Sequence, residues 1–533
     1  MSAGSWLFAR AARLPKRTSK SDVERDIPVP MPDGATLLAD RYYPVNEPRA
    51  PIVLVRSPYG RGLISAMTGR MFAEQGYQCV VQSCRGTFGS GGTFEPFVHE
   101  AADGQATLNW LATQPWFGGE VVTYGASYLG YTQWSAVIAP PPYLKALALQ
   151  VTASTLRGIW YPADVFALDT ALTWVHSVSH QEDKGLKVLL ALLTQRRALA
   201  PAFSRLPLNE ADQAAVGDKV AFFQDYLANE SADAPLWHDI DRTAAVPGLA
   251  APTTMLAGWY DIFLVDQLAD YATMVANGRS PWLTIGPWTH TSPAGATTGV
   301  RDSVELFDTV VRGKRSKRRQ PVRIFVMGSK RWIDLPVWPP PATSTTWHLR
   351  PGGLLSDAAP ATPVDAAVGS YTYDPADPTP SLGGAVLGTN AGRRDNSKLE
   401  TRPDVLTYTT EPLSRDTTVI GPVTASLRVR SSAEFTDFFV RLCDVTPKGK
   451  SLNVCDGLTR VTNPDTVEVA LSPTAHCFKQ GHRIRVQVSS GAHPRWARNL
   501  GTGEPIGTAV TMKAAAQEIL HPSTITVPLW EQR

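Results

Sequence analysis

The chain has 533 residues and a formal net charge of +3, from 51 Lys and Arg against 48 Asp and Glu. Its length supports several domains and excludes a disulfide-stapled miniprotein, and a hydrophobic share of 43% indicates a folded chain rather than a low-complexity one. Because the charges nearly balance, the whole molecule has no strong field that would attract nucleic acid or an anionic membrane, and we expect no nucleic-acid partner.

The cysteines are few and scattered: Cys79, Cys84, Cys443, Cys455 and Cys477. Their spacing indicates neither a disulfide framework nor a zinc site, so we expect no metal and a reducing compartment. Residues 1–24 are basic but lack the apolar core of a secretory signal, and no apolar run is long enough to span a membrane. The sequence therefore predicts a cytoplasmic protein with a flexible basic N-terminus and no integral membrane span.

Residues 25–150 alternate short apolar runs with helical stretches, which is typical of a doubly wound α/β domain. A hairpin around Asp33-Gly34 opens this segment. The expected strands are Pro51–Arg56, Tyr77–Val81, Val121–Tyr124 and Ala146–Leu149, and the expected helices are Leu63–Gln75, Glu100–Thr113 and Tyr128–Val137.

Residues 151–246 contain helical runs and no convincing strand, so they predict a helical cap inserted into the α/β domain. The alternation resumes over residues 247–338, with expected strands at Thr253–Ala257, Trp282–Ile285 and Val322–Val326 and an expected helix at Leu264–Asn277. A proline cluster then predicts a linker, with Pro336, Pro339, Pro340 and Pro341. Residues 342–533 show only short strands separated by turns, which indicates a jelly-roll β-sandwich domain.

Ser127 is the first candidate for chemistry. It lies between an expected strand and an expected helix, with Gly125 two residues before it and Gly130 three residues after it. A serine at such a sharp turn, a nucleophile elbow, needs glycine or small residues around it. The usual spacing would place the second glycine at Leu129. The strand and helix on either side still predict a nucleophile, against the alternative of a turn serine without chemistry.

A serine hydroxyl needs a base to remove its proton, and the base needs an acid to orient it. In a parallel sheet these groups follow later strands, at the same edge as the serine. Asp261 and His290 each follow an expected strand, and His290 alone among the ten histidines is so placed. Asp261 could instead serve only as a helix cap, in which case Asp266 or Asp270 would be the acid.

A series of motifs in this order resembles the cocaine esterase-like and X-Pro dipeptidyl-peptidase-like α/β-hydrolases, from about residue 25 to the C-terminus. The matching segments are Arg56–Tyr59, Arg85–Gly92, Asp103–Trp116, Gly125–Gly130, Gly258–Asp261, Gly286–His290, Thr436–Val445 and Val488–Gly491. The resemblance implies an α/β-hydrolase core with a helical cap and a C-terminal jelly-roll domain. The family's GxSYxG motif also accounts for the displaced glycine.

The resemblance further implies roles for individual residues. Ser127 would attack an ester or amide carbonyl, His290 would take and return the proton, and Asp261 would orient His290. The backbone N–H of Tyr128 and the phenolic O–H of Tyr59 would hold the oxyanion; the alternative for Tyr59 is a loop aromatic packed as a lid.

Large aromatic residues are expected around the same site. Trp160, Trp174 and Phe263 match family positions that line a substrate pocket, with ordinary core packing as the alternative. Trp259 and Trp288 each stand two residues before the acid or the base in the sequence, so we expect the tryptophans to enclose the site.

These observations predict a serine hydrolase that cleaves small-molecule carboxylic esters through an acyl-enzyme, without a cofactor. An X-Pro dipeptidyl-peptidase or an amino-acid ester or amide acylase is the alternative, but either needs a carboxylate for the free ammonium of its substrate. A non-catalytic binding protein that uses the jelly roll is disfavoured by the complete order of serine, acid and histidine. The physiological substrate and the oligomeric state, a homodimer included, stay open.

The predicted function leaves one basic run of the sequence unexplained. Arg312–Arg319 contains six Lys and Arg residues. A solvated loop before the strand at Val322 accounts for it, with a polyanion-binding or membrane-binding patch as the alternative.

Overall fold

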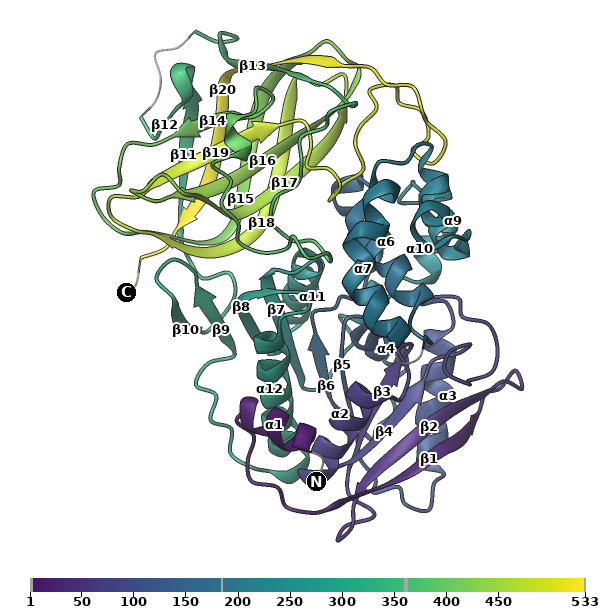
Figure 1. Cartoon of the computed structure of the whole chain (residues 1–533). Helices are drawn as coiled ribbons and strands as arrows, with labels where there is room; N and C mark the ends of the chain where they lie inside the picture. The colour runs from purple at the N-terminus through teal and green to yellow at the C-terminus, as the bar shows by residue number, and fades with distance from the viewer. Residues whose placement is uncertain (1–2, 184–185, 359–362, 532–533) are drawn as a thin grey trace.

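The computed structural model of the chain describes residues 3–183, 186–358 and 363–531. A mixed α/β layer forms one end of the molecule and an all-β domain the other, with a group of helices alongside both (Figure 1). The helices of this group lie between residues 157 and 245. Within the described ranges, no helix combines the length and the apolar character that crossing a membrane requires.

The first sheet has the strand order β1-β2-β4-β3-β5-β6-β7-β8-β9-β10. Its strands are β1 (Ser21–Pro30), β2 (Thr36–Pro44), β3 (Ile52–Ser57), β4 (Gln78–Ser83), β5 (Val121–Ala126), β6 (Leu144–Gln150), β7 (Thr253–Tyr260), β8 (Trp282–Thr289), β9 (Val322–Val326) and β10 (Arg331–Leu335). The strands from β4 to β9 in this order pair in parallel, and β1, β2 and β10 are antiparallel to their neighbours.

Helices cover both faces of this sheet. One face carries α1 (Ala3–Ala11), α2 (Leu63–Glu74) and α12 (Pro293–Arg312), and the other carries α3 (Glu100–Ala112), α4 (Tyr128–Ala136) and α11 (Leu264–Ala276). Strand β3 shows why both faces need cover: Val53 and Val55 pack toward the first group, and Ile52 and Leu54 toward the second. The predicted doubly wound α/β core is therefore confirmed.

The helices between β6 and β7 pack on the carboxyl edge of the sheet. They are α5 (Arg157–Trp160), η1 (Pro162–Asp164), α6 (Leu168–Ser179), α7 (Leu186–Phe203), η2 (Leu208–Glu210), α8 (Ala211–Val216), α9 (Ala221–Ala228), α10 (Pro235–Asp239) and η3 (Thr243–Ala245). Their aromatic core includes Tyr128 and Phe263, which stand where β5 and β7 have just ended. The cap is thus placed directly over the strand ends that carry the candidate residues.

The C-terminal domain is all-β, as predicted. Its elements are β11 (Thr343–Arg350), η4 (Pro351–Gly353), β12 (Leu354–Ser356), β13 (Ala367–Tyr373), η5 (Leu399–Thr401), β14 (Leu406–Thr409), β15 (Thr417–Ser431), β16 (Phe435–Val445), β17 (Ser451–Thr462), β18 (Thr466–Phe478), β19 (Arg483–Ser489) and β20 (Ala515–Leu529). The strand order is β17-β16-β19-β14-β12-β11-β20-β15-β18, with β13 beside β20. Gly457 of β17 lies against the backbone of Ala470 on β18, so the sheet curls until its two ends meet.

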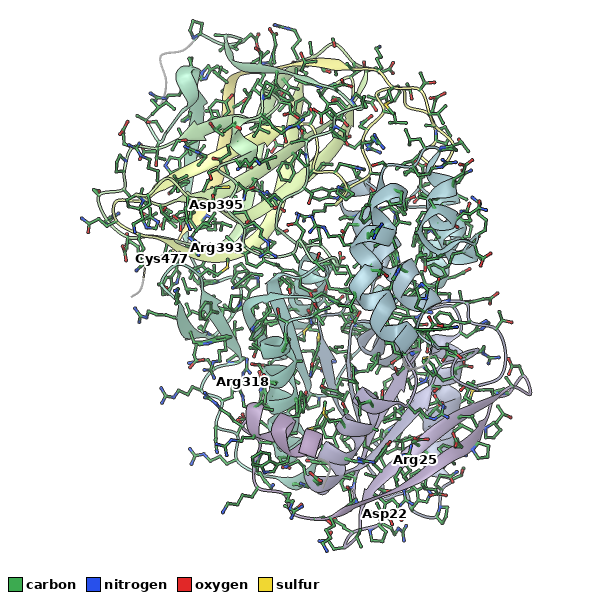
Figure 2. All side chains as sticks on the ribbon, in the orientation of Figure 1. Asp22, Arg25, Arg318, Arg393, Asp395 and Cys477 are labelled. Carbon is green, nitrogen blue, oxygen red and sulfur yellow. The ribbon has the colours of Figure 1, made fainter. Side chains whose placement is uncertain are left out.

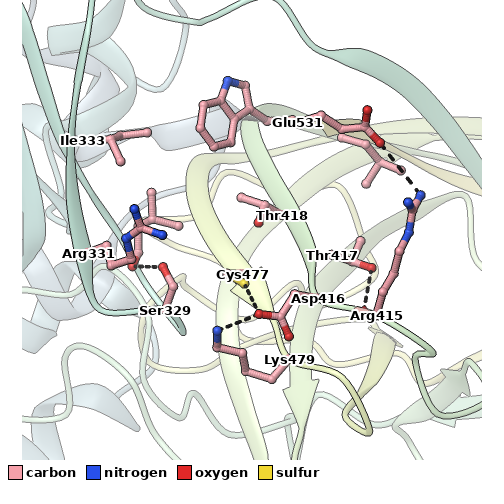
Figure 3. A pocket seen from close by; sticks show the side chains of 13 residues that line it. Ser329, Arg331, Ile333, Arg415, Asp416, Thr417, Thr418, Cys477, Lys479 and Glu531 are labelled. Carbon is pink, nitrogen blue, oxygen red and sulfur yellow. Dashed lines mark hydrogen bonds and ion pairs between the residues drawn. The ribbon is translucent and has the colours of Figure 1, made fainter. Parts of the chain in front are cut away.

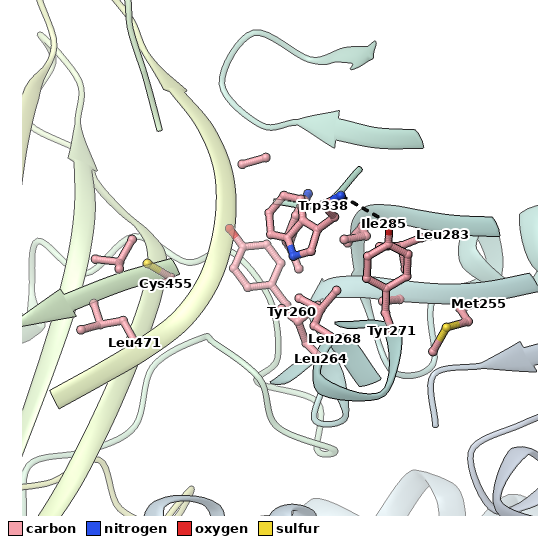
Figure 4. Packing of buried hydrophobic residues seen from close by; sticks show 14 of the residues in the cluster. Met255, Tyr260, Leu264, Leu268, Tyr271, Leu283, Ile285, Trp338, Cys455 and Leu471 are labelled. Carbon is pink, nitrogen blue, oxygen red and sulfur yellow. Dashed lines mark hydrogen bonds between the residues drawn. The ribbon is translucent and has the colours of Figure 1, made fainter. Parts of the chain in front are cut away.

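The two sheets share one hydrophobic core. Tyr260 and Trp338 pack between helix α11 and the all-β domain, where Cys455 and Leu471 approach them (Figure 4). The Tyr260 hydroxyl also donates to the Asn453 carbonyl at 3.1 Å. This buried contact holds the all-β domain against the strand that precedes Asp261.

The N-terminal segment differs from the prediction of a flexible tail. Residues 3–11 form α1, Ala12 is buried against the sheet helices, and Ser21 already pairs with Pro44 in the first sheet. Helix α12, which follows His290, is not among the elements predicted from the sequence. The α12 sequence contains glycines and many charged residues, so the helix is hard to recognise from the sequence. The helix is stabilised mainly by packing of one face against β6 and β7.

Candidate active site

Ser127 occupies a strained turn between β5 and α4. Its backbone angles are φ 59° and ψ −124°, which a non-glycine residue adopts only where the surroundings enforce it. A Cβ on Gly125 would lie 2.5 Å from the Leu129 carbonyl oxygen, and a Cβ on Gly130 would lie 2.4 Å from the Thr152 methyl carbon. The second glycine is therefore needed at position 130, where the helix passes β6.

Three side chains from three strand ends meet at this turn. The His290 Nε2 is 3.0 Å from the Ser127 Oγ, and the His290 Nδ1 is 2.8 Å from an Asp261 carboxylate oxygen. Asp261 and His290 directly follow β7 and β8, so the parallel sheet brings all three to one edge. With Nδ1–H donated to the carboxylate, Nε2 is left to accept the serine proton.

The acid is fixed in place by its own loop. The Asp261 side chain is fully buried, and its second oxygen accepts the Phe263 backbone N–H at 2.8 Å. Asp270, one of the alternatives, instead accepts the backbone N–H of Ser154 at 2.8 Å and also its hydroxyl. The structure therefore pairs His290 with Asp261.

Two possible oxyanion donors flank the serine. The Tyr128 backbone N–H is at the first position of α4, where no intrahelical acceptor exists. The Tyr59 hydroxyl lines the same cavity as Ser127. It accepts the Trp174 Nε1–H at 3.1 Å, and an indole can only donate.

The Tyr59 proton is thus not used by Trp174, and no acceptor for it exists among the described residues. Desolvation raises the pKa of Tyr59 to about 12, while the Trp174 hydrogen bond lowers it in part. The phenol therefore keeps its proton at neutral pH and remains a donor.

The Tyr128 ring is held separately from its backbone N–H. Its hydroxyl donates to Glu100 at 2.9 Å and accepts the Phe97 N–H at 2.9 Å. Glu100 in turn pairs with Arg56 at 2.9 Å, both side chains being buried. Burial and the Glu100 charge raise the pKa of Tyr128, so the phenol keeps the proton that it donates to Glu100.

A cavity of about 440 Å³ opens over the serine. Trp160, Trp174 and Phe263 all line it, and the Phe263 ring stacks on His290 at 5.5 Å. Two further parts of the lining were not predicted from the sequence: Phe97, which stacks on Trp174 at 5.6 Å, and the segment Leu387–Thr389 of the all-β domain. No local pattern identifies this segment, because it reaches the cavity only when the domains pack together.

Two tryptophans were placed wrongly. Trp259 donates to the Phe325 carbonyl at 2.7 Å and packs on Trp338, away from the cavity. Trp288 packs against Trp332 and against the glycines of its own strand. Both tryptophans still belong to strands β7 and β8 and pack within the body of the sheet, whereas Asp261 and His290 lie in the loops beyond the strand ends, where the chain turns toward the cavity.

A second cavity, of about 400 Å³, lies between the β9–β10 hairpin and the β15 and β18 strands (Figure 3). Four of its five charged residues form pairs, Lys479 with Asp416 at 2.7 Å and Arg415 with Glu531 at 3.8 Å, and the fifth is Arg331. Cys477 lies beside the first pair, and none of the described lining residues is a histidine. This cavity therefore holds no nucleophile paired with a base of the kind found at Ser127.

No metal site accompanies either cavity within the described parts of the chain, where His, Cys, Asp and Glu are nowhere grouped in threes as an ion would require. The chemistry that the first cavity offers is that of a hydroxyl nucleophile, a base and preplaced hydrogen-bond donors.

The chain is similar to known proteins over nearly its whole length. Residues 33–292 match the X-Pro dipeptidyl-peptidase (S15) family, and residues 314–523 match the X-Pro dipeptidyl-peptidase C-terminal non-catalytic domain. Cocaine esterase from Rhodococcus is 34% identical, over 95% of this chain and 98% of that protein.

Two solved structures share the fold. An aminopeptidase from a Thaumarchaeota archaeon superposes with a TM-score of 0.83 at 21% identity, covering 96% of this chain and 97% of its own. An α-amino acid ester hydrolase superposes with a TM-score of 0.81 at 23% identity, covering 97% and 98%. The chain therefore belongs to the cocaine esterase and X-Pro dipeptidyl-peptidase family of serine hydrolases, enzymes that act on esters or peptides.

Proposed function

We propose that this enzyme is a carboxylesterase in which Ser127 is the nucleophile, His290 the general base and acid, and Asp261 the group that orients His290. The observation that carries the proposal is the continuous hydrogen-bonded chain from the Ser127 Oγ through both His290 nitrogens to a buried carboxylate. Such a chain activates a hydroxyl that is otherwise a poor nucleophile. Membership of the family excludes the alternative of a non-catalytic binding protein.

In the first half-reaction the Ser127 oxygen bonds to the ester carbonyl carbon while His290 takes its proton. The carbonyl oxygen becomes an oxyanion, which accepts hydrogen bonds from the Tyr128 N–H and the Tyr59 O–H. The bond to the alcohol oxygen then breaks, and His290 gives its proton to the departing alcohol. Water repeats the sequence on the acyl-enzyme, releasing the carboxylic acid and restoring Ser127.

The Trp174 N–H has a role in this scheme. Since it donates to the Tyr59 oxygen, it leaves the phenolic proton as the group that can point into the cavity. Trp160, next to Trp174 with ring centroids 5.4 Å apart, has an indole nitrogen without a partner among the described residues. Trp160 therefore contacts Trp174 by packing and makes no hydrogen bond to Tyr59.

The cavity lining favours a neutral ester over a substrate with a free ammonium. None of the described residues that line it is an aspartate, glutamate, lysine or arginine. The adjoining cavity contains Asp169, but that carboxylate already accepts the Gly388 N–H at 3.0 Å. A buried ammonium would find no carboxylate among the described residues that line the cavity over Ser127, so a dipeptidyl-peptidase or amino-acid acylase activity is the second candidate, supported by the family description.

A fluorophosphonate probe tests the nucleophile directly. We expect the wild-type protein to be labelled and Ser127→Ala not to be; labelling of the variant would refute the assignment. A kinetic panel of acyl and aryl esters against Xaa-Pro anilides and amino-acid amides then tests the substrate class. Turnover of the Xaa-Pro anilide alone would overturn the esterase proposal.

We also propose a cytoplasmic location. The five cysteines are all free and buried, which suits a reducing compartment. Fractionation of the native host, followed by immunoblotting, tests this.

A further inference from the structure

Two basic segments that are far apart in the sequence meet beside the end of α2. The Gln75 side chain donates to the Pro15 carbonyl at 3.1 Å, and the Thr18 N–H donates to the Glu74 carbonyl at 2.8 Å. From the other side, Arg312 donates to the Gln75 carbonyl at 2.9 Å. Figure 1 shows the result, with α1 lying in front of α12 and near the loop that follows it. The N-terminal basic residues and the run after α12 thus share one surface.

Eight cations of these two segments are exposed, and none forms an ion pair with any residue that the structure describes. We call them the basic surface: Arg10, Arg13, Lys16, Arg17, Lys20, Arg315, Lys317 and Arg319. The whole chain carries only +3, so the rest of the molecule is net negative and the positive charge is concentrated here.

The other charged groups of the region are already engaged. Arg318, labelled in Figure 2, turns inward and donates to the Leu283 carbonyl at 2.6 Å. Lys314 pairs with Asp308 at 3.0 Å, and Glu305 accepts the backbone N–H groups of Lys317 and Arg318 at 2.6 and 3.1 Å. These acids hold the loop in shape and leave the basic side chains of the surface without partners.

The form of the surface indicates the kind of partner. None of its eight residues lines any of the four best-formed cavities of the described chain. Trp6 on α1 is 47% exposed and stands beside Arg10, 5.6 Å from the guanidinium carbon to the ring centroid. A tryptophan beside basic side chains is the combination that seats a short helix in the interface of an anionic bilayer. We propose that the basic surface, together with Trp6, docks this enzyme on anionic phospholipid bilayers.

Docking in this way leaves the catalytic cavity free. Helix α12 begins three residues after His290 and is 20 residues long, which places its far end about 30 Å away. The basic surface is at that far end, at the sheet edge opposite Ser127. Binding is therefore expected to leave hydrolysis of a soluble ester unchanged.

Vesicle sedimentation with the full-length protein tests the proposal. One set of vesicles is phosphatidylcholine alone. The other contains about 30 mol% phosphatidylglycerol, which gives it a negative surface like that of a cytoplasmic leaflet. We expect binding to the anionic vesicles only, weakened by raising the salt concentration. A fourfold variant removes half of the charge of the basic surface: Lys16→Gln/Arg17→Gln/Arg315→Gln/Lys317→Gln. Each lost charge should reduce the affinity for anionic vesicles roughly fivefold, so the variant should bind at least about a hundredfold more weakly.

A control of equal charge separates the surface from net charge. Lys398, Lys448, Lys450 and Lys513 are exposed cations of the all-β domain, and their fourfold change to Gln should leave vesicle binding nearly unaffected. Both variants should keep wild-type esterase activity and melting temperature. Equal weakening by the control set, or no binding of the wild type at low salt, would overturn the proposal.

Nucleic acid is tested as the competing partner. Trp6→Ala should weaken vesicle binding severalfold and leave retention of a 20-nucleotide RNA in a gel-shift assay unchanged. RNA bound more tightly than anionic vesicles, with no effect of Trp6→Ala on the vesicles, would assign the surface to a polyanion instead and refute membrane docking.

Discussion

The hydrogen bond from Trp174 to Tyr59 can be tested by substitution, with the neighbouring Trp160 as the control residue. Trp174→Phe keeps an aromatic ring in contact with Phe97 and Trp160 but removes the donor that engages the Tyr59 oxygen. Trp160→Phe removes an equally large indole from the same cavity, and that indole nitrogen has no partner among the described residues. The two variants therefore differ in one hydrogen bond.

The magnitudes follow from the role of Tyr59. Tyr59→Phe deletes an oxyanion donor, which costs about 10²- to 10³-fold in kcat. Trp174→Phe leaves that donor present but no longer oriented, and a neutral hydrogen bond contributes about 0.5–1.5 kcal/mol, or roughly two- to tenfold in rate. Trp160→Phe should change KM through packing, with a smaller effect on the rate of acylation.

A double-mutant cycle tests the coupling. The burst-phase acylation rate and kcat/KM are measured with a p-nitrophenyl ester for the wild type, the single variants and each tryptophan change in a Tyr59→Phe background. If Trp174 acts through Tyr59, Trp174→Phe should have little further effect in that background, whereas Trp160→Phe should have the same effect in both. Equal losses from Trp174→Phe with and without the Tyr59 hydroxyl would refute the reasoning, and wild-type kcat in Tyr59→Phe would refute the oxyanion role itself.

Two further predictions concern the framework of the site. Gly130→Ala should lower the melting temperature by several degrees, because the added Cβ would overlap Thr152. Gly62→Ala is the control and should leave the melting temperature unchanged, because nothing lies close to its Cβ. Equal melting temperatures of the two variants would contradict the packing argument. Burial raises the pKa of Asp270 to about 7 from 3.8, so its contribution to folding is most favourable at low pH and is lost as the pH rises through the folded pKa. Asp270→Asn, which can keep both contacts to Ser154, should therefore gain melting temperature relative to the wild type between pH 5 and pH 8, and a difference that does not grow with pH would contradict the raised pKa.

The amino-acid sequence was sufficient for those parts of the enzyme that depend on local patterns. Apolar runs and helical stretches in alternation predict a doubly wound sheet, and the strand, serine and helix around Ser127 predict a sharp turn because glycine is needed where the chain passes itself. The order of strands then limits Asp261 and His290 to loops at the same edge of the sheet. The resemblance to a family added Tyr59 and Tyr128, which no periodicity would identify.

Only the tertiary structure decided how side chains from distant segments meet. The Trp174 to Tyr59 hydrogen bond joins residues 115 positions apart, and Leu387–Thr389 reach the cavity from another domain. Trp259 and Trp288, each two residues before the acid or the base in the sequence, pack away from the cavity. The direction of a side chain depends on packing across the whole fold, and the same long-range packing turns two separate basic segments into one surface.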